Sequence, residues 1–435
     1  MISRITRHLR MLAGDGCLCT RFLCWSYPTK AFGTLVSIFA SLLLLGSLMA
    51  AEPTWQHVPI TREFLSEGVA VGDFNHDGQW DVAAGDFWFA APNWQRFPVR
   101  PMKNREGQPT DHYDGSKGYS NTFAQWSYDI NRDGWDDLII VGFPGAPCYW
   151  YQNPRHTEGF WPEYQVWHSA CNETPYFTDL NGDGRPELLL GSQPERQMGY
   201  LPIPDPDRVQ HTWAFHPLSD PGDPMKNGTF MYYHGLGVGD INGDGRLDVL
   251  IPHGGYLAPH TSGGSWSFVP WTLAPDGQPP LPSSNLYTLD LDLDGDQDIV
   301  TSSAHRYGVW WFENLQQSPA QPGPFRMHLI DESFSQSHAL WLGDLQGDGI
   351  PTIVTGKRFF AHNGVGDPGE HEPVVMMTYR ILRQPGQPPR FERREIVEGQ
   401  NTGVGTQFQV FDLDRNGKLD LILSNKKGVH LLLQQ

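Results

Sequence analysis

The stretch "GLGVGDINGDGRLDVLIPHGG", from Gly235 to Gly255, places an acidic loop directly before an apolar run. Asp240, Asp244 and Asp248 fall within nine residues, and the same pattern recurs along the chain. Copies this similar, spaced about 50 to 70 residues apart, identify an internal repeat. The seven copies begin at Asp73, Asp129, Asp179, Asp240, Asp290, Asp344 and Asp412.

Each repeat predicts four β-strands. A short glycine-containing strand precedes the loop, and a β-branched or leucine-rich strand follows it. An aromatic strand and a strand of alternating polarity complete the unit. Four strands in a repeat of this length are typical of a β-propeller blade, and a solenoid of the same units is the alternative.

The two ends of the repeat region favour a closed ring. After Asp412 only 23 residues remain, which is enough for two further strands but not three. The missing outer strand matches Thr54–Ile60, ahead of the first loop. A strand there would complete the last blade and remove a free sheet edge. We therefore expect an all-β fold over residues 52–435, a seven-bladed β-propeller of four-stranded blades closed by its N-terminal strand.

The first 51 residues have the pattern of a targeting segment. Basic residues precede the apolar run Phe32–Ala51, and small residues end it, as in an export signal. We expect residues 1–51 to be this signal and the protein to be secreted, periplasmic or on the cell surface. A retained membrane anchor is the alternative, since about 20 apolar residues can span a bilayer. The net charge of −18 argues against a nucleic-acid partner.

The acidic loops predict bound Ca²⁺. Oxygen-bearing side chains occupy loop positions 1, 3, 5 and 9, and glycine at position 6 permits a sharp turn. Hard oxygen ligands in a flexible turn suit Ca²⁺ better than Mg²⁺, although Asp-Gly and Asn-Gly also occur as simple turn formers. The loop at Asp344 carries Gln346 and Thr352 and should bind weakly or not at all. The expected ligands are Asp73, Asn75, Asp77, Asp81, Asp129, Asn131, Asp133, Asp137, Asp179, Asn181, Asp183, Glu187, Asp240, Asn242, Asp244, Asp248, Asp290, Asp292, Asp294, Asp298, Asp412, Asp414, Asn416 and Asp420.

These loops resemble the FG-GAP and VCBS-type repeats of integrin-α-like propellers, whose calcium loops join the first two strands of a blade. The resemblance extends from Thr54 to the C-terminus. It implies a calcium-stabilised propeller but no single activity. A fainter similarity, through "SYDINRDGWDDLIIVG" and "YWYQNP", is to the propeller of aldos-2-ulose dehydratase.

The face opposite the acidic loops gathers the candidate ligand-binding residues. In a four-stranded blade, the turns that enter strand one and leave strand two lie on this face. The candidates are His234, His253, His305, His338, Lys357, Arg358 and Asn401. We expect His234, His338 and Asn401 to point into one cavity, with His253 and His305 farther out. Such groups suit a sugar, a carboxylate or a metal, but some of the 17 histidines would fall on any face.

Two further expectations concern this face. Cys148 and Cys171 fall on adjacent turns and are candidates for a disulfide. The long insert that begins at Gly356 should reach over the centre of the ring, or else be a simple linker.

Two classes of function remain open. The first is an exported binding or adhesion module for carbohydrate or protein. The second is a carbohydrate-acting enzyme, a lyase or dehydratase, with its site in the central funnel. No short catalytic motif assigns catalytic residues, and a propeller assembles its site from distant blades.

Overall fold

The computed structural model describes residues 53–435 except single positions at 106, 262, 276, 317, 319, 398, 400 and 401. The expected export signal and Asn401 therefore lie outside the described residues. Within the described part of the chain, no helix has the length and apolar character needed to cross a membrane.

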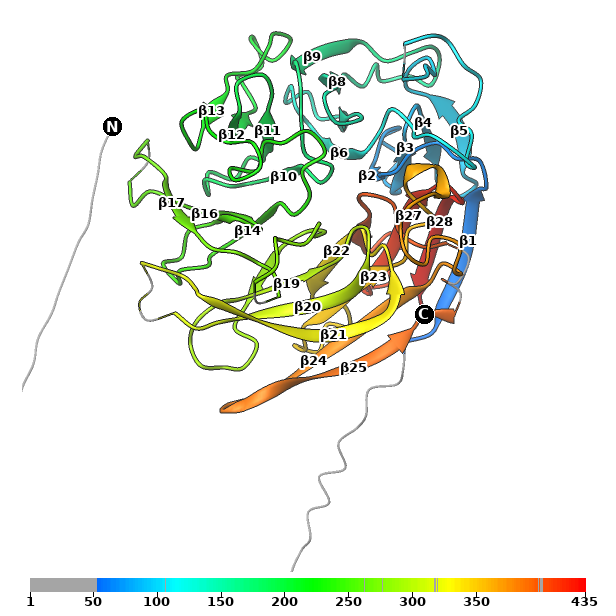
Figure 1. Ribbon diagram of the computed structural model, residues 1–435. Helices are drawn as coiled ribbons and strands as arrows, with labels where there is room; N and C mark the ends of the chain where they lie inside the picture. The colour runs from blue at the N-terminus through cyan, green and yellow to red at the C-terminus, as the bar shows by residue number, and fades with distance from the viewer. Residues whose placement is uncertain are drawn as a thin grey trace, which may run out of the picture. The chain divides into compact units, whose positions relative to one another are not determined.

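The strands of the described residues form seven antiparallel sheets of four strands each, arranged as a seven-bladed β-propeller (Figure 1). This confirms the predicted fold. A short 3-10 helix, η1 (His362–Gly364), lies in the insert of the sixth blade.

The first blade contains β2 (Ala70–Gly72), β3 (Asp81–Ala84), β4 (Phe87–Ala90) and β5 (Gln95–Pro98). The second contains β6 (Ala124–Tyr128), β7 (Asp137–Val141), β8 (Cys148–Tyr151) and β9 (Glu163–Trp167). The third contains β10 (Tyr176–Thr178), β11 (Glu187–Ser192), β12 (Gln197–Pro202) and β13 (His216–Pro217). Blades four to six contain β14 (Gly237–Gly239), β15 (Asp248–Ile251), β16 (Gly254–Leu257) and β17 (Ser267–Pro270); β18 (Tyr287–Leu289), β19 (Asp298–Ser302), β20 (Tyr307–Asn314) and β21 (Phe325–Ser335); β22 (Leu340–Gly343), β23 (Thr352–Gly356), β24 (Met376–Gln384) and β25 (Gln387–Glu395).

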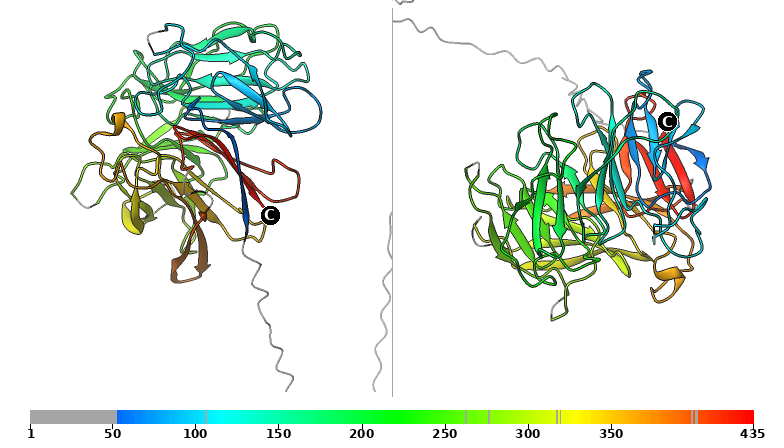
Figure 2. Two further views of the ribbon diagram at one scale, coloured as in Figure 1. Left: turned by 90° about the vertical axis from the view of Figure 1, so that its right-hand side faces the viewer. Right: turned by 90° about the horizontal axis from the view of Figure 1, so that it is seen from above.

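The seventh blade closes the ring as the sequence predicted. It contains β26 (Gln409–Phe411), β27 (Asp420–Asn425), β28 (Gly428–Gln434) and, as its outer strand, β1 (Trp55–Thr61). The outer strand pairs antiparallel with β28, from Trp55 opposite Gln434 to Thr61 opposite Val429. The blue N-terminal strand accordingly runs beside the red C-terminal strands (Figure 2). The predicted strand, Thr54–Ile60, differs from the observed one by a single position at each end.

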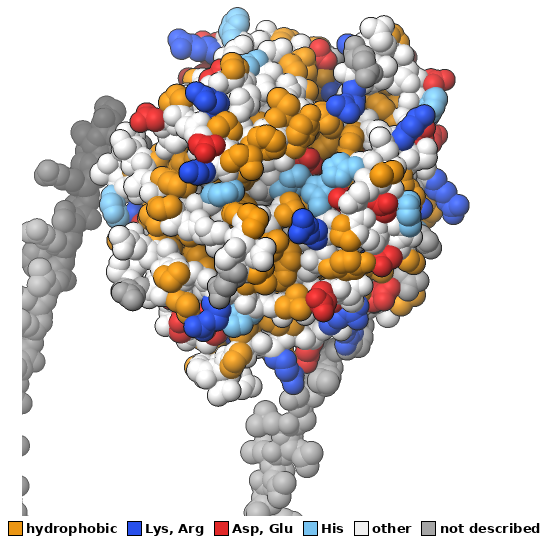
Figure 3. Space-filling view, in the orientation of Figure 1, with side chains coloured by type: hydrophobic (Ala, Val, Ile, Leu, Met, Phe, Trp, Pro, Cys, Tyr) orange, Lys and Arg blue, Asp and Glu red, His pale blue; other side chains and the backbone are white. Residues whose placement is uncertain are grey.

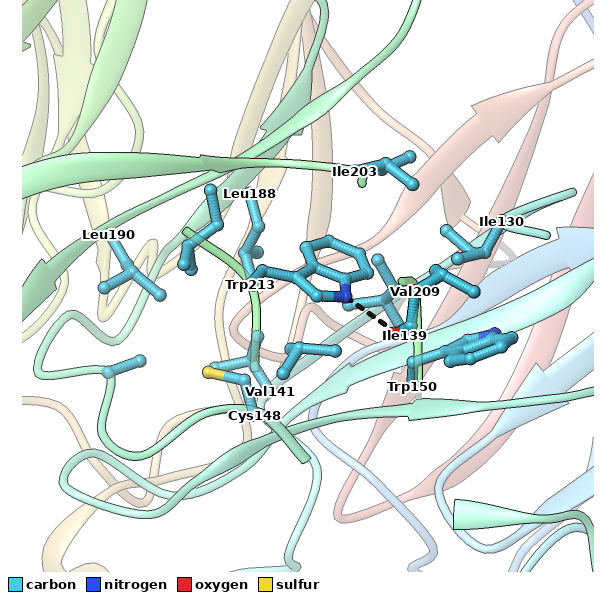
Figure 4. Close-up of a cluster of buried hydrophobic side chains, with 13 residues drawn as sticks. Ile130, Ile139, Val141, Cys148, Trp150, Leu188, Leu190, Ile203, Val209 and Trp213 are labelled. Atoms are coloured by element: carbon cyan, nitrogen blue, oxygen red, sulfur yellow. Dashed lines mark hydrogen bonds between the residues drawn. The ribbon is translucent and has the colours of Figure 1, made fainter. Parts of the chain in front are cut away.

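The hydrophobic core lies between neighbouring blades. The second strand of each blade is completely buried, because blades cover both of its faces, as in β7 and β11. One cluster joins Trp150 of the second blade to Leu188 of the third and includes Trp213, whose indole N–H donates to the carbonyl of Val209 at 3.1 Å (Figure 4). The inner strands approach closely around the axis. A side chain at Gly237 would lie 2.3 Å from the carbonyl oxygen of Leu286, so only glycine fits there.

The strand order separates two sets of turns. The acidic loops join the first and second strands of each blade, so they lie at one end of the blades. Glycine at loop position 6, such as Gly245 with φ of +84°, provides the left-handed turn that reverses the chain. The turns that enter the first strand and leave the second lie at the other end, where the described ligand-binding candidates, such as His234 and His338, are.

Candidate functional site

Four side chains that precede inner strands share one sequence register. Glu67, Glu173, His234 and His338 each lie six positions before the first Asp of an acidic loop. They precede β2, β10, β14 and β22, in the first, third, fourth and sixth blades. Because inner strands surround the propeller axis, this register directs the four residues to one central region, although they are far apart in sequence.

Three histidines meet in this region. The Nε2 atoms of His234 and His305 are 3.0 Å apart, and one ring nitrogen of His338 lies within 4.8 Å of theirs. His338 is completely buried, whereas the other two side chains are slightly exposed, at 11 % and 13 %. Figure 3 shows histidine side chains gathered near the middle of the face that it presents.

Two carboxylates contact these imidazoles. Glu173 Oε2 lies 3.0 Å from Nε2 of His338 and 3.5 Å from Nε2 of His234. Asp367, from the insert of the sixth blade, has Oδ2 2.8 Å from Nδ1 of His305. Burial lowers the pKa of His305, and burial together with the nearby Arg358 guanidinium lowers the pKa of His338 well below its usual value. Burial thus favours the neutral form of both rings.

A buried group of cations lies beside the histidines. Lys426, after β27, places Nζ 2.8 Å from Oε1 of Glu67, and both side chains are 2 % exposed. Arg358, after β23, has Nη2 3.9 Å from Oε2 of the same Glu67. Neither terminal nitrogen of Arg358 has a hydrogen-bond partner among the described residues. Buried polar groups are almost always paired, so this guanidinium has unused capacity to bind an anion.

Aromatic side chains form a row next to the cations. Tyr119 lies under the Arg358 guanidinium, with its ring centroid 5.7 Å from Cζ. Its ring is 5.5 Å from that of Phe143, which is in turn 5.6 Å from the ring of Tyr232. Tyr232 is 41 % exposed, so the row runs from the buried cations to the surface.

The insert of the sixth blade covers part of the site. The backbone N–H of His362 donates to the hydroxyl of Tyr119 at 3.0 Å, and Asn363 Oδ1 accepts from the N–H of Gly118 at 2.6 Å. Lys357 is buried with its ammonium donating to the carbonyls of Arg358 and Glu370. The insert thus contacts the segment between the first and second blades and supplies Asp367 to the histidines.

The structure brings some predicted residues together and places others elsewhere. His305 was expected farther out, and this was wrong, because its turn bends inward to contact His234. His253 does lie outside the cluster, where Nδ1 is 2.6 Å from the hydroxyl of Tyr233. Lys357 is directed into its own insert and not toward a ligand. Asn401 lies outside the described residues.

The predicted disulfide is not present in the structure. Cys148 and Cys171 are both buried free thiols. Cys148 packs in the core cluster between the second and third blades, while Cys171 contacts the side chain of Asn172. Burial raises the pKa of each thiol to about 12, so neither ionises readily.

The acidic loops at the other end of the blades are built alike. In the fourth loop, Asp240 Oδ1 accepts from the N–H of Asp244 at 3.0 Å, and Oδ2 accepts from the N–H of Gly245 at 2.7 Å. The position 9 carboxylate, Asp248, is buried, and burial raises its pKa to about 7. Its oxygens accept from the N–H groups of Ile241 and Ala258, which fixes the loop to the blade.

Two loops have oxygen geometry that fits a cation. The carboxylates of Asp290, Asp292 and Asp294 place one oxygen each within 4.8 Å of one another, and Asp412, Asp414 and Asp420 do the same. The Oδ1 atoms of Asp290 and Asp412 are buried without a hydrogen-bond partner among the described residues. Like charges this close repel one another, so a divalent cation would stabilise both arrangements.

The sixth loop differs from these. The Arg380 guanidinium lies 2.7 Å from Oδ2 of Asp348 and also donates to the side chain of Gln346. Thr352 replaces the acid at position 9. A side-chain cation therefore already compensates the charge of this loop.

Sequence reasoning missed several contributors to the site, among them Glu67, Glu173, Tyr119 and Asp367. Glu67 and Glu173 could have been found, because they share the register of His234 and His338 six positions before a loop. Tyr119 and Asp367 lie in irregular segments, where no repeat predicts their position.

A comparison with family models agrees with the repeats described above. The model of the FG-GAP-like repeat family matches residues 129–190 and 240–301, and no curated protein matches the sequence. An Agrocybe aegerita lectin that recognises non-reducing terminal N-acetylglucosamine has 15 % identity and a TM-score of 0.41, over 80 % of this chain and 81 % of that one. The rhamnogalacturonan lyase YesW has 10 % identity and a TM-score of 0.43, over 87 % and 75 %. The WD40 domain of SCAP from fission yeast has 10 % identity and a TM-score of 0.35, over 87 % and 98 %. Similarities this low carry no argument about function. The chain is a seven-bladed β-propeller that contains FG-GAP-like repeats.

Proposed function

We propose that this protein is a calcium-binding β-propeller that binds an acidic carbohydrate in the centre of the ring. The observation that carries the proposal is the buried Arg358 guanidinium, whose terminal nitrogens have no hydrogen-bond partner among the described residues. A carboxylate accepts two parallel hydrogen bonds from a guanidinium, which makes it the ligand group best matched to this side chain. Lys426, with its ammonium close by, adds a second positive charge.

The aromatic row favours a sugar over a peptide as the carrier of that carboxylate. Tyr119, Phe143 and Tyr232 extend from the guanidinium to the surface. Flat aromatic faces pack well against the apolar face of a pyranose ring and remain compatible with its hydroxyl groups. A uronic acid combines such a ring with a carboxylate.

Calcium in the acidic loops would have a structural role. The loops lie at the opposite end of the blades from the proposed ligand site, and their position 9 carboxylates attach them to the blade backbone. If Ca²⁺ binds only the folded loops, each site filled at a hundredfold excess over Kd adds about 2.7 kcal/mol to the free energy of unfolding. Chelation should therefore lower the melting temperature, and Ca²⁺ should restore it better than Mg²⁺.

The ligand proposal can be tested by calorimetric titration in Ca²⁺. Oligomers of galacturonate and glucuronate should bind, whereas the matching neutral oligomers should bind weakly. Arg358→Gln should weaken uronate binding by at least about 30-fold, since loss of a buried charged partner costs about 2 kcal/mol or more. Arg390→Gln, at an exposed position on β25, is the control and should bind normally. Equal affinity for acidic and neutral oligomers would contradict the proposal.

A second candidate function is a lyase or dehydratase acting on the same ligand. The observation that favours it is the contact between His234 and Glu173, 3.5 Å apart, with the Arg358 guanidinium near Glu173. A cation that neutralises a uronate carboxylate acidifies the adjacent C–H, and an imidazole is a suitable base for that proton. The test is the appearance of unsaturated-sugar absorbance on incubation with polyuronates.

A further inference from the structure

The three histidines near the centre of the ring are arranged as the ligands of a metal ion are. Three imidazoles, from His234, His305 and His338, converge with one ring nitrogen each within 4.8 Å of the others. They come from the fourth, fifth and sixth blades and lie on separate turns. The buried Nδ1 of His338 has no hydrogen-bond partner in the described part of the chain.

We propose that His234, His305 and His338 bind a divalent transition-metal ion of the Zn²⁺ class, at a site separate from the acidic loops. Nitrogen-rich sites select such ions, whereas Ca²⁺ and Mg²⁺ prefer oxygen ligands. Tetrahedral Zn²⁺ with Zn–N bonds of about 2.0 to 2.1 Å separates its ligand nitrogens by about 3.3 Å. The Nε2 atoms of His234 and His305 are 3.0 Å apart, so a small displacement accommodates the ion. Three protein ligands leave the fourth position free for water or a ligand group.

Asp367 acts as the outer partner that metal-binding histidines usually have. Its Oδ2 lies 2.8 Å from Nδ1 of His305. A proton on that Nδ1 leaves Nε2 of His305 bare and directed at His234. In this arrangement Nε2 of His234 must carry the proton between the two rings. On metal binding, His234 would adopt its other neutral tautomer, with the proton on Nδ1 and Nε2 free to bind the ion.

The local charge suits a dication. Glu173 and Asp367 are the two carboxylates that contact the three histidines, and together they carry a charge of −2. Glu67, by contrast, is paired with Lys426 and Arg358. The two carboxylates next to the rings would thus balance the charge of the ion, while the cations remain balanced by Glu67 and by the proposed uronate.

A neighbouring group shares one proposed ligand, His305, and its outer partner, Asp367, and it provides an internal control. His305, Asp367 and His362 also place one ligand atom each within 4.8 Å of one another. The ring of His362 stacks on that of His305 at 4.8 Å, but its side chain is 54 % exposed. The buried cluster supplies three imidazoles, which is the stronger ligand set for Zn²⁺, and so His362 should be dispensable.

The experiment uses the full chain, stripped with a chelator and then saturated with Ca²⁺ to fill the acidic loops. Zn²⁺ is titrated by calorimetry, and Co²⁺ is added as a spectroscopic substitute. We expect one Zn²⁺ per chain and the visible absorption of four-coordinate Co²⁺. His234→Ala and His305→Ala should abolish both signals, and Asp367→Asn should reduce affinity by roughly 10- to 100-fold. His362→Ala should bind as the unchanged protein does. Thermal unfolding in Ca²⁺ checks that each variant is folded.

Three results would overturn the proposal. The unchanged protein could fail to bind stoichiometric Zn²⁺, folded His234→Ala could bind with full affinity, or His362→Ala could lose as much affinity as His234→Ala. The last result would place the ion in the outer group. Because the titration contains no carbohydrate, its outcome is independent of whether uronates bind.

Discussion

Replacing Glu67 by glutamine should strongly destabilise the propeller. Glu67 Oε1 lies 2.8 Å from Nζ of Lys426, and Oε2 lies 3.9 Å from Nη2 of Arg358. All three side chains are 2 % exposed, so Glu67→Gln leaves two buried cations without the carboxylate that lies within 4 Å of each of them. Breaking a buried ion pair in this way costs about 3 to 5 kcal/mol. Glutamine keeps the side-chain volume and one acceptor oxygen, so we expect a loss at the lower end of this range, about 3 kcal/mol of the free energy of unfolding.

The assay is urea unfolding in Ca²⁺, with Glu63→Gln as the matched control. Glu63 pairs with Arg96 at 2.6 Å, but these side chains are 62 % and 43 % exposed, so the control should lose less than about 1 kcal/mol. A bound uronate would supply the missing negative charge, so it should stabilise Glu67→Gln more than it stabilises the unchanged protein. If Glu67→Gln loses no more stability than Glu63→Gln, the reasoning about this buried charge group is refuted.

Three further predictions concern the loops, the ring and acid stability. Asp294→Ala should lower the Ca²⁺-dependent gain in melting temperature. Asp348→Ala should leave that gain almost unchanged, because Arg380 already compensates the charge of the sixth loop. An equal effect of the two substitutions would contradict the prediction that the two loops bind Ca²⁺ unequally. Deleting residues 54–60 removes the outer strand of the seventh blade and should cause aggregation or loss of cooperative unfolding, measured by light scattering and calorimetry; a stable monomer would argue against the closure. Burial lowers the pKa of His430 from 6.5 to about 4. The contribution of the neutral ring to the free energy of unfolding is therefore fully present above pH 6.5 and is lost as the pH falls toward 4. The loss reaches about 3 kcal/mol at most, and His430→Gln should flatten the stability profile in this range, as followed by urea unfolding.

The repeat determined how much of the fold could be predicted. The spacing of Asp73, Asp129 and the later loops gave the blade number, and the strand pattern at Thr54–Ile60 gave the closure. These signals are local, because each blade is a short run of hairpins whose periodicity is visible in the sequence. The boundaries of the acidic loops followed from the same pattern.

The site was less predictable because its residues come from different blades and from irregular segments. The position of His234 and His338 followed from the strand order, but the inward bend that brings His305 to them did not. Asp367 depends on how the sixth-blade insert folds over the ring. Cys148 is the first residue of β8 and packs in the core between blades, whereas Cys171 contacts the side chain of Asn172, and the order of the strands alone does not predict this separation.

The pairing of β1 with β28 also fixes the order of assembly during synthesis. Six blades consist of consecutive strands and can form as the chain emerges, but the seventh joins Trp55 to Gln434. Its first strand is made early and must wait, unpaired, for the last. Glu67 lies just after that early strand and Lys426 just before the last one. Their contact across the junction therefore forms only when the ring closes, so a chain with an open ring would have its blades but not its complete binding site.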